Sequence, residues 1–146
     1  MKTVEFLQYG ENLIETWYYS PIPKEYHGKF LYACSFCLNF FKEKGELEEH
    51  SEKCTARAPP GDEIYRDDKL AMFEVDGRTQ RVYTENLSYI AKFFLDHKVI
   101  QYELSAFIFY VLCERKEDGY HMVGYFSREK ENVWNNLSCI MVLPSC

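Results

Sequence analysis

Cys34-Ser35-Phe36-Cys37, with His50 and Cys54 further along the chain, forms the metal-ligand pattern Cys-x2-Cys-x12-His-x3-Cys. The short gap in the first pair lets a tight knuckle direct both thiolates at one ion. The His-x3-Cys spacing places the last two ligands one turn apart on one face of a helix. Three thiolates and a neutral imidazole complete the tetrahedral set that Zn²⁺ prefers and leave no position for a substrate. The sequence therefore predicts a structural zinc site on these four side chains.

The segment around this pattern has the composition of a small zinc finger over about residues 30–54. Gly45 precedes a helix predicted over 46–53, and five apolar side chains supply a miniature core: Phe36, Leu38, Phe40, Phe41 and Leu47. The predicted helix carries four glutamates, Glu46, Glu48, Glu49 and Glu52. Because these carboxylates would repel phosphates, we do not expect direct DNA binding. The alternative to a zinc site is an accidental spacing of four buried residues.

Composition limits the class of protein. The chain has 146 residues, 17 of them basic and 23 acidic, and a net charge of −6. Its 17% of aromatic residues excludes a disordered chain. The longest apolar run, 106–113, is much shorter than the roughly 20 residues that span a membrane. The N-terminus has no apolar segment of signal-peptide length, so the six cysteines are expected in an intracellular protein and not in a disulfide framework.

Residues 58–61, Ala-Pro-Pro-Gly, mark the best internal boundary. They divide the chain into an N-terminal unit that contains the finger, 1–60, and a second unit, 61–146. In the second unit, 70–75 reads as a strand, Asp76-Gly77 as a hairpin turn and 80–83 as the partner strand.

A helix should follow that hairpin. Thr84 is the expected N-cap, and the end is expected near His97 and Lys98. Its apolar residues, with the spacing of one buried stripe, are Leu87, Ile90, Ala91, Phe94 and Leu95.

The rest of the sequence reads as strands. Residues 107–112 are apolar on both faces and predict a central strand. A turn at 117–119 leads to a strand at 121–126, and a polar loop over 128–136 leads to a final strand at 137–143. The expected fold class is therefore α+β with a mainly antiparallel sheet.

Seven short sequence blocks, taken in their order along the chain, indicate a family resemblance. They are Thr16–Pro21, the finger pattern, Pro59–Arg66, Phe73–Gly77, Phe94–Lys98, Gly124–Lys130 and Ser138–Pro144. In this order the chain resembles the MYST family of histone acetyltransferases over nearly its whole length. The resemblance implies a zinc-finger lobe packed on the N-terminal and central part of a GNAT-like acetyltransferase core. It also implies a nuclear enzyme that transfers acetyl from acetyl-CoA to histone tails, as a subunit of a chromatin-modifying complex away from membranes.

The resemblance assigns roles to individual residues. Cys139 matches the family's active-site cysteine, and Ile140, Met141 and Val142 match the strand that contacts the pantetheine arm of acetyl-CoA. Lys98 matches the lysine that family members autoacetylate. The residues alone are also compatible with a buried core cysteine, an ordinary sheet core and an exposed lysine at a helix end.

The resemblance also shows what the chain lacks. In the family, a glycine-rich loop that holds the CoA pyrophosphate follows the strand at 137–143, and the general-base glutamate comes later. This sequence ends at Cys146 and contains no Gly-x-Gly. We therefore expect a truncated chain without turnover of its own. The alternative function is a non-catalytic zinc-finger interaction module or a truncated paralogue.

Overall fold

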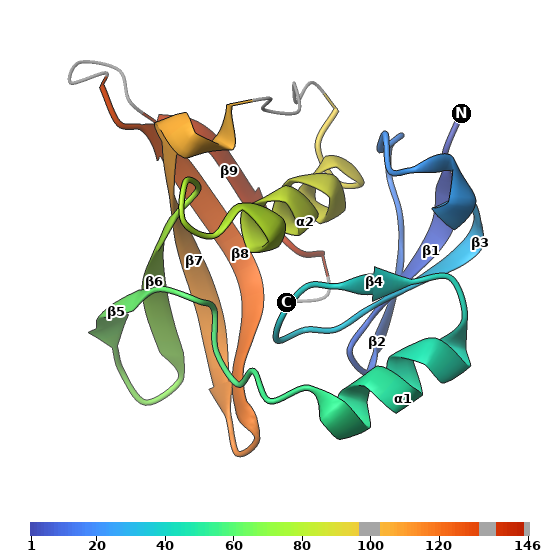
Figure 1. Cartoon of the computed structure of the whole chain (residues 1–146), viewed down its shortest axis with the longest axis horizontal. Coiled ribbons are helices and arrows are strands. Elements are labelled where there is room, and N and C mark those ends of the chain that lie inside the picture. The colour runs from blue at the N-terminus through green and yellow to red at the C-terminus, as the bar shows by residue number, and fades with distance from the viewer. Residues whose placement is uncertain (97–102, 132–136, 145–146) are drawn as a thin grey trace.

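Two β-sheets with helices α1 and α2 form the chain in this computed structural model, which describes residues 1–96, 103–131 and 137–144 (Figure 1). The first sheet has the order β2-β1-β3-β4. Its strands are β1 (Val4–Tyr9), β2 (Asn12–Glu15), β3 (Gly28–Ala33) and β4 (Phe40–Phe41). The second has the order β5-β6-β7-β8-β9. Its strands are β5 (Asp62–Arg66), β6 (Leu70–Asp76), β7 (Phe107–Lys116), β8 (Gly119–Glu129) and β9 (Leu137–Val142).

The first sheet forms the N-terminal part of the molecule. β1 runs parallel to β3, and its other neighbour, β2, is antiparallel. Leu7 pairs with both Ile14 and Leu31, and all three side chains are buried. Helix α1 (Lys44–Lys53) follows β4 and presents only Leu47 to the interior. The finger is therefore built on a sheet that begins with the first strand of the chain.

The second sheet is antiparallel between every pair of neighbours. Alternate residues of β6 and β7 meet on its buried face, where Phe73 pairs with Val111 and Val75 with Phe109. This alternation is the period of a strand with one face against the core. Short 3-10 turns occur at Lys24–Tyr26 and Leu104–Ala106.

Helix α2 (Arg81–Lys92) lies between the two sheets in Figure 1. Its buried stripe includes Leu87, Ile90 and Ala91, as the sequence predicts. On the side of the first sheet, the Ser20 hydroxyl donates a hydrogen bond of 2.8 Å to the carbonyl of Tyr89. One continuous apolar cluster joins both sheets and this helix. None of the described helices has the length and apolar character that would let it cross a membrane.

Several expectations from the sequence are confirmed. The chain is α+β, the strand at 70–75 is β6, and the strand at 107–112 belongs to β7 in the middle of the second sheet. The turn at 117–119 and the strands at 121–126 and 137–143 are present as the β7–β8 turn, β8 and β9.

The hairpin partner at 80–83 is wrong, because these residues form the start of α2 and β6 pairs instead with β5 and β7. The Thr84 N-cap is wrong for the same reason. Thr84 is buried inside the helix, and its hydroxyl donates to the Gln80 carbonyl at 2.9 Å. The apolar stripe starts one turn earlier than expected, at Tyr83, and burial of this ring extends the helix towards the turn.

Other boundaries also differ. Gly45 lies inside α1, which begins at Lys44, and β8 continues to Glu129 into the expected loop. Helix α2 ends at Lys92, before the expected end. Residues 97–98 and the remainder of the loop, 132–136, lie outside the described residues.

Candidate functional site

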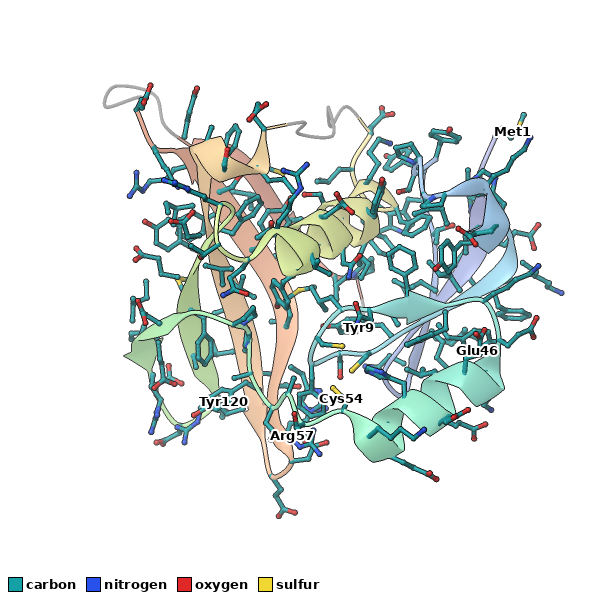
Figure 2. All side chains as sticks on the ribbon, in the orientation of Figure 1. Met1, Tyr9, Glu46, Cys54, Arg57 and Tyr120 are labelled. Atoms are coloured by element: carbon teal, nitrogen blue, oxygen red, sulfur yellow. The ribbon has the colours of Figure 1, made fainter. Side chains whose placement is uncertain are left out.

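The four predicted zinc ligands meet in one cluster. The ligand atoms of Cys34, Cys37, His50 and Cys54 all lie within 4.8 Å of one another. A tight turn after β3 forms the knuckle, where the Leu38 amide donates to the Cys34 carbonyl at 2.9 Å and Leu38 itself has a φ of 65°. His50 comes from α1, and Cys54 caps its C-terminus, where Figure 2 labels it.

Hydrogen bonds within the cluster favour the thiolate form of Cys34, which is the form that binds a cation. The Cys37 side chain hydrogen-bonds to Cys34 and lowers the pKa of the Cys34 thiol below its ordinary value. The same contact raises the pKa of Cys37, because Cys37 keeps the shared proton. The Cys37 sulfur is 3.3 Å from Nε2 of His50, whose ring packs against Phe41.

Three sulfurs and one imidazole nitrogen at this spacing fit zinc in type and number. A divalent cation would displace the shared proton and hold both thiolates. Because all four positions would be filled by protein, the cluster suits a structural ion and not a catalytic one. It is the one group of at least three such ligands among the described residues.

Cys139 lies elsewhere, on β9. Its side chain is half-buried, and the Tyr125 hydroxyl donates a hydrogen bond to its sulfur at 3.4 Å. Tyr125 is only 3% exposed. Burial raises the pKa of Tyr125 well above its ordinary value. The phenol therefore keeps its proton at neutral pH and remains a donor to the cysteine.

The three residues after Cys139 alternate across the sheet. Met141 is 3% exposed and belongs to the core, whereas Ile140 and Val142 are 60% and 58% exposed. β9 pairs with β8 on one side, and its other side has no strand partner among the described residues. β9 therefore offers backbone polar groups and two apolar side chains to a ligand. Lys98 lies outside the described residues.

Both parts of the chain match known families. Residues 1–54 match the model of the MYST family zinc finger domain, and residues 58–146 match that of the MOZ/SAS family. The chain belongs to the MYST family. The family and the observed ligand geometry support the same conclusion for the finger, which has the Cys-Cys-His-Cys group of a structural zinc site.

Relatives within the MYST family align with almost the whole chain. "Histone acetyltransferase of the MYST family 2" of Arabidopsis thaliana is 53% identical over 148 residues, which cover 99% of this chain and 33% of the relative. "Putative MYST-like histone acetyltransferase 1" of Oryza sativa is 51% identical, with 99% and 32% covered. "Histone acetyltransferase MOF" of Drosophila melanogaster is 43% identical, with 99% and 18% covered. The chain thus spans about a third or less of these curated relatives.

Sequence reasoning missed Tyr125 as the partner of Cys139. In the sheet Tyr125 pairs with Met141, and Cys139 pairs with Ser127, so tyrosine and cysteine are diagonal neighbours on one face. Only the register of β8 against β9 reveals this contact. The sequence signal for that register, the polar loop between the two strands, does not fix how many residues the turn uses.

Proposed function

We propose that this MYST-family chain carries the zinc-finger lobe and the donor-side strand of a protein-lysine acetyltransferase that transfers acetyl from acetyl-CoA to histone tails in the nucleus. The observation that carries the proposal is the similarity to proteins named histone acetyltransferases across 99% of the chain, at 53% identity for the Arabidopsis protein. The matches to the zinc-finger and MOZ/SAS models in their expected order support it.

We assign β9 as the strand that contacts acetyl-CoA, the acetyl donor. An extended pantetheine arm presents amide groups that can pair with the edge of β9 that has no strand partner among the described residues, and Ile140 and Val142 add exposed apolar surface beside it. Met141 anchors the strand in the core. Cys139, with Tyr125 as a hydrogen-bond donor, borders the acetyl group either as nucleophile or as neighbour.

The substrate lysine, which accepts the acetyl group, needs a base that removes its proton. A lysine amine attacks a thioester only when neutral, and its ordinary pKa is about 10.4, so a positioned base must take the proton. We assign that role to none of the described glutamates. Lys98 remains the proposed site of autoacetylation.

The finger has a structural role in this proposal. Cys34, Cys37, His50 and Cys54 would hold zinc and thereby fix the knuckle to α1. The glutamates of α1 are exposed, which disfavours contact with DNA and leaves the finger to pack within the enzyme or against other subunits of a chromatin-modifying complex. We propose 1–60 and 61–146 as the two units of this arrangement.

Binding of acetyl-CoA tests the assignment of β9. We expect titration of the isotope-labelled, zinc-loaded chain with acetyl-CoA to shift the amide resonances of residues 139–142 most, with α1 unaffected. The matched variant is Cys139→Ala, which keeps the backbone. If Cys139 is only a neighbour of the acetyl group, Cys139→Ala should bind acetyl-CoA with unchanged affinity. Any acetyl transfer to a histone-tail peptide is then measured by mass spectrometry. Shifts scattered away from β9, or none at millimolar acetyl-CoA, would contradict the proposal.

A further inference from the structure

A chain of three polar side chains joins the knuckle to the β7–β8 turn. Ser35 follows Cys34, and its hydroxyl oxygen lies 2.7 Å from Nδ1 of His121 on β8. The other ring nitrogen, Nε2, lies 2.6 Å from a carboxylate oxygen of Asp118 in the turn. The side chain of His121 is 17% exposed and that of Asp118 is 62% exposed. The imidazole therefore holds the knuckle on one side and the hairpin turn on the other.

Aromatic packing surrounds the contact between the knuckle and the β7–β8 hairpin. The ring of Phe36, also in the knuckle, lies 4.4 Å from the ring of His121, and the Arg57 guanidinium lies 5.0 Å from the Phe36 ring. Figure 2 shows Arg57 between Cys54 and Tyr120, and the Tyr120 amide donates to the Arg57 carbonyl at 2.8 Å. A Cβ on Gly119 would lie 2.6 Å from that carbonyl oxygen. The hairpin tip is thus fitted closely against the finger.

A buried tyrosine also links the knuckle to β8. Tyr9, at the end of β1, is 3% exposed. Its hydroxyl donates to the carbonyl of Met122 at 2.6 Å and lies 3.4 Å from the carbonyl of Ser35. The backbone beside His121 and the backbone of the knuckle therefore share one buried partner.

The Ser-His-Asp order does not make this a hydrolytic triad. In such triads the serine contacts Nε2 and the carboxylate contacts Nδ1, which is the reverse of what is seen here. Ser35 is only 8% exposed, so a substrate does not reach its hydroxyl. The array is suited to holding the backbone of the knuckle in place.

We propose that His121 is a positioning residue for the zinc site: through Ser35 it fixes the turn that presents Cys34 and Cys37, so that zinc retention depends on the β7–β8 hairpin. The inference rests on the proposed structural zinc. Coupling of this kind is reciprocal, so bound zinc also stabilises the hairpin tip. The acetyltransferase sheet then forms part of the support of the metal centre, as outer residues do in other metal sites.

Two variants separate the contact with Ser35 from the contact with Asp118. In His121→Asn the amide takes the place of Nδ1 and can still reach Ser35, whereas in His121→Gln it takes the place of Nε2 and reaches only Asp118. Zinc release from the full chain to a chromogenic chelator is the measurement. We expect His121→Gln to release zinc about tenfold faster than the unchanged chain and His121→Asn to release it at nearly the original rate.

The zinc content of the unchanged chain is measured first. It tests the proposed structural zinc separately from the positioning role of His121. A folded chain without zinc refutes the proposed structural zinc. If the chain holds zinc and both variants release it at the original rate, or both release it equally fast, the role of His121 is overturned.

Hydrogen exchange supplies the second readout. Chelation of zinc from the unchanged chain should lower amide protection at residues 120–122 more than in the centre of β6 and β7. In His121→Gln the same chelation should change the hairpin tip less, because the link is already broken. Equal loss of protection throughout the sheet, or none at the tip, would contradict the coupling.

Discussion

At the scale of single residues, the environment of each cysteine decides its chemistry. Cys34 hydrogen-bonds to Cys37 in the metal cluster, which lowers the pKa of Cys34, and Cys139 is half-buried beside a hydroxyl donor. Cys113 is 0% exposed on the core face of β7. Burial disfavours its thiolate and raises the pKa of Cys113 to about 12. Of these thiols, Cys113 is therefore the inert one.

The raised pKa of Cys113 predicts a loss of stability at high pH. An unfolded thiol ionises near 9.0, whereas the buried one keeps its proton to about 12, so the native state binds more protons in this window. The free energy of unfolding should fall there by about 1.4 kcal/mol per pH unit from this group, and it is unaffected below the window. Urea unfolding at pH 8 to 11 measures the slope.

The control for that slope is Cys113→Ala, which removes the titrating group and leaves the buried tyrosines that also ionise at high pH. Equal slopes for the two proteins would show that Cys113 does not titrate as expected.

Spacing in the sequence is sufficient to predict the four ligands, because Cys-x2-Cys and His-x3-Cys are local geometries of a turn and a helix. The contacts of Tyr125 and His121 join residues distant in sequence: Cys139 is 14 positions from Tyr125, and Ser35 is 86 from His121. They depend on strand register and on how the finger docks, which no local pattern contains.

At the scale of elements, the turn from β6 into α2 shows how tertiary packing overrides a local signal. Asp76-Gly77 is a strong hairpin signal, but the Asp76 carboxylate accepts the Arg78 amide at 2.8 Å and also pairs with Lys130 at 2.7 Å. Gly77 packs against the backbone of Leu104. The glycine is needed here for a close approach of two chain segments.

Substitution of that glycine should be costly. In Gly77→Ala the new Cβ would lie 2.0 Å from the carbonyl oxygen of Leu104, so the backbone must move. We expect a loss of about 1–3 kcal/mol in the free energy of unfolding, measured by urea denaturation. The matched control is Gly28→Ala, where no heavy atom of the described residues, apart from those of its chain neighbours, lies within 4 Å of the added group. Equal stabilities of the two variants would refute the crowding argument.

At the scale of the whole molecule, one apolar core joins the finger to the second sheet. Leu31 and Leu38 from the finger and Val111 and Met122 from the second sheet are each 0% exposed within the same cluster. The sequence places a boundary at 58–61, and it predicts the family through the order of its blocks. The resemblance implies that the finger packs on the second unit, but no local pattern identifies the residues of the shared interior, because these depend on packing between elements.

Removal of a zinc ligand should therefore affect more than the finger. We expect Cys37→Ser to lose stoichiometric zinc and to melt at a lower temperature in one transition, because binding energy at structural zinc sites is about 10 kcal/mol or more and the core is shared. Metal analysis and thermal unfolding by circular dichroism measure both effects. The control, Cys139→Ser, leaves the four ligands intact and should keep its zinc. Retention of zinc by Cys37→Ser would contradict the ligand assignment.

The hydrogen bond from Tyr9 to Met122 joins residues 113 positions apart. During synthesis on a ribosome, β1 and the finger cysteines Cys34, Cys37 and Cys54 emerge before β8, so the proposed zinc ligands are available before the β7–β8 hairpin can pack against them. Closing so long a loop is entropically unfavourable until later contacts compensate for it. We therefore expect the contact between the knuckle and the β7–β8 hairpin to form late, only after β8 has been synthesised.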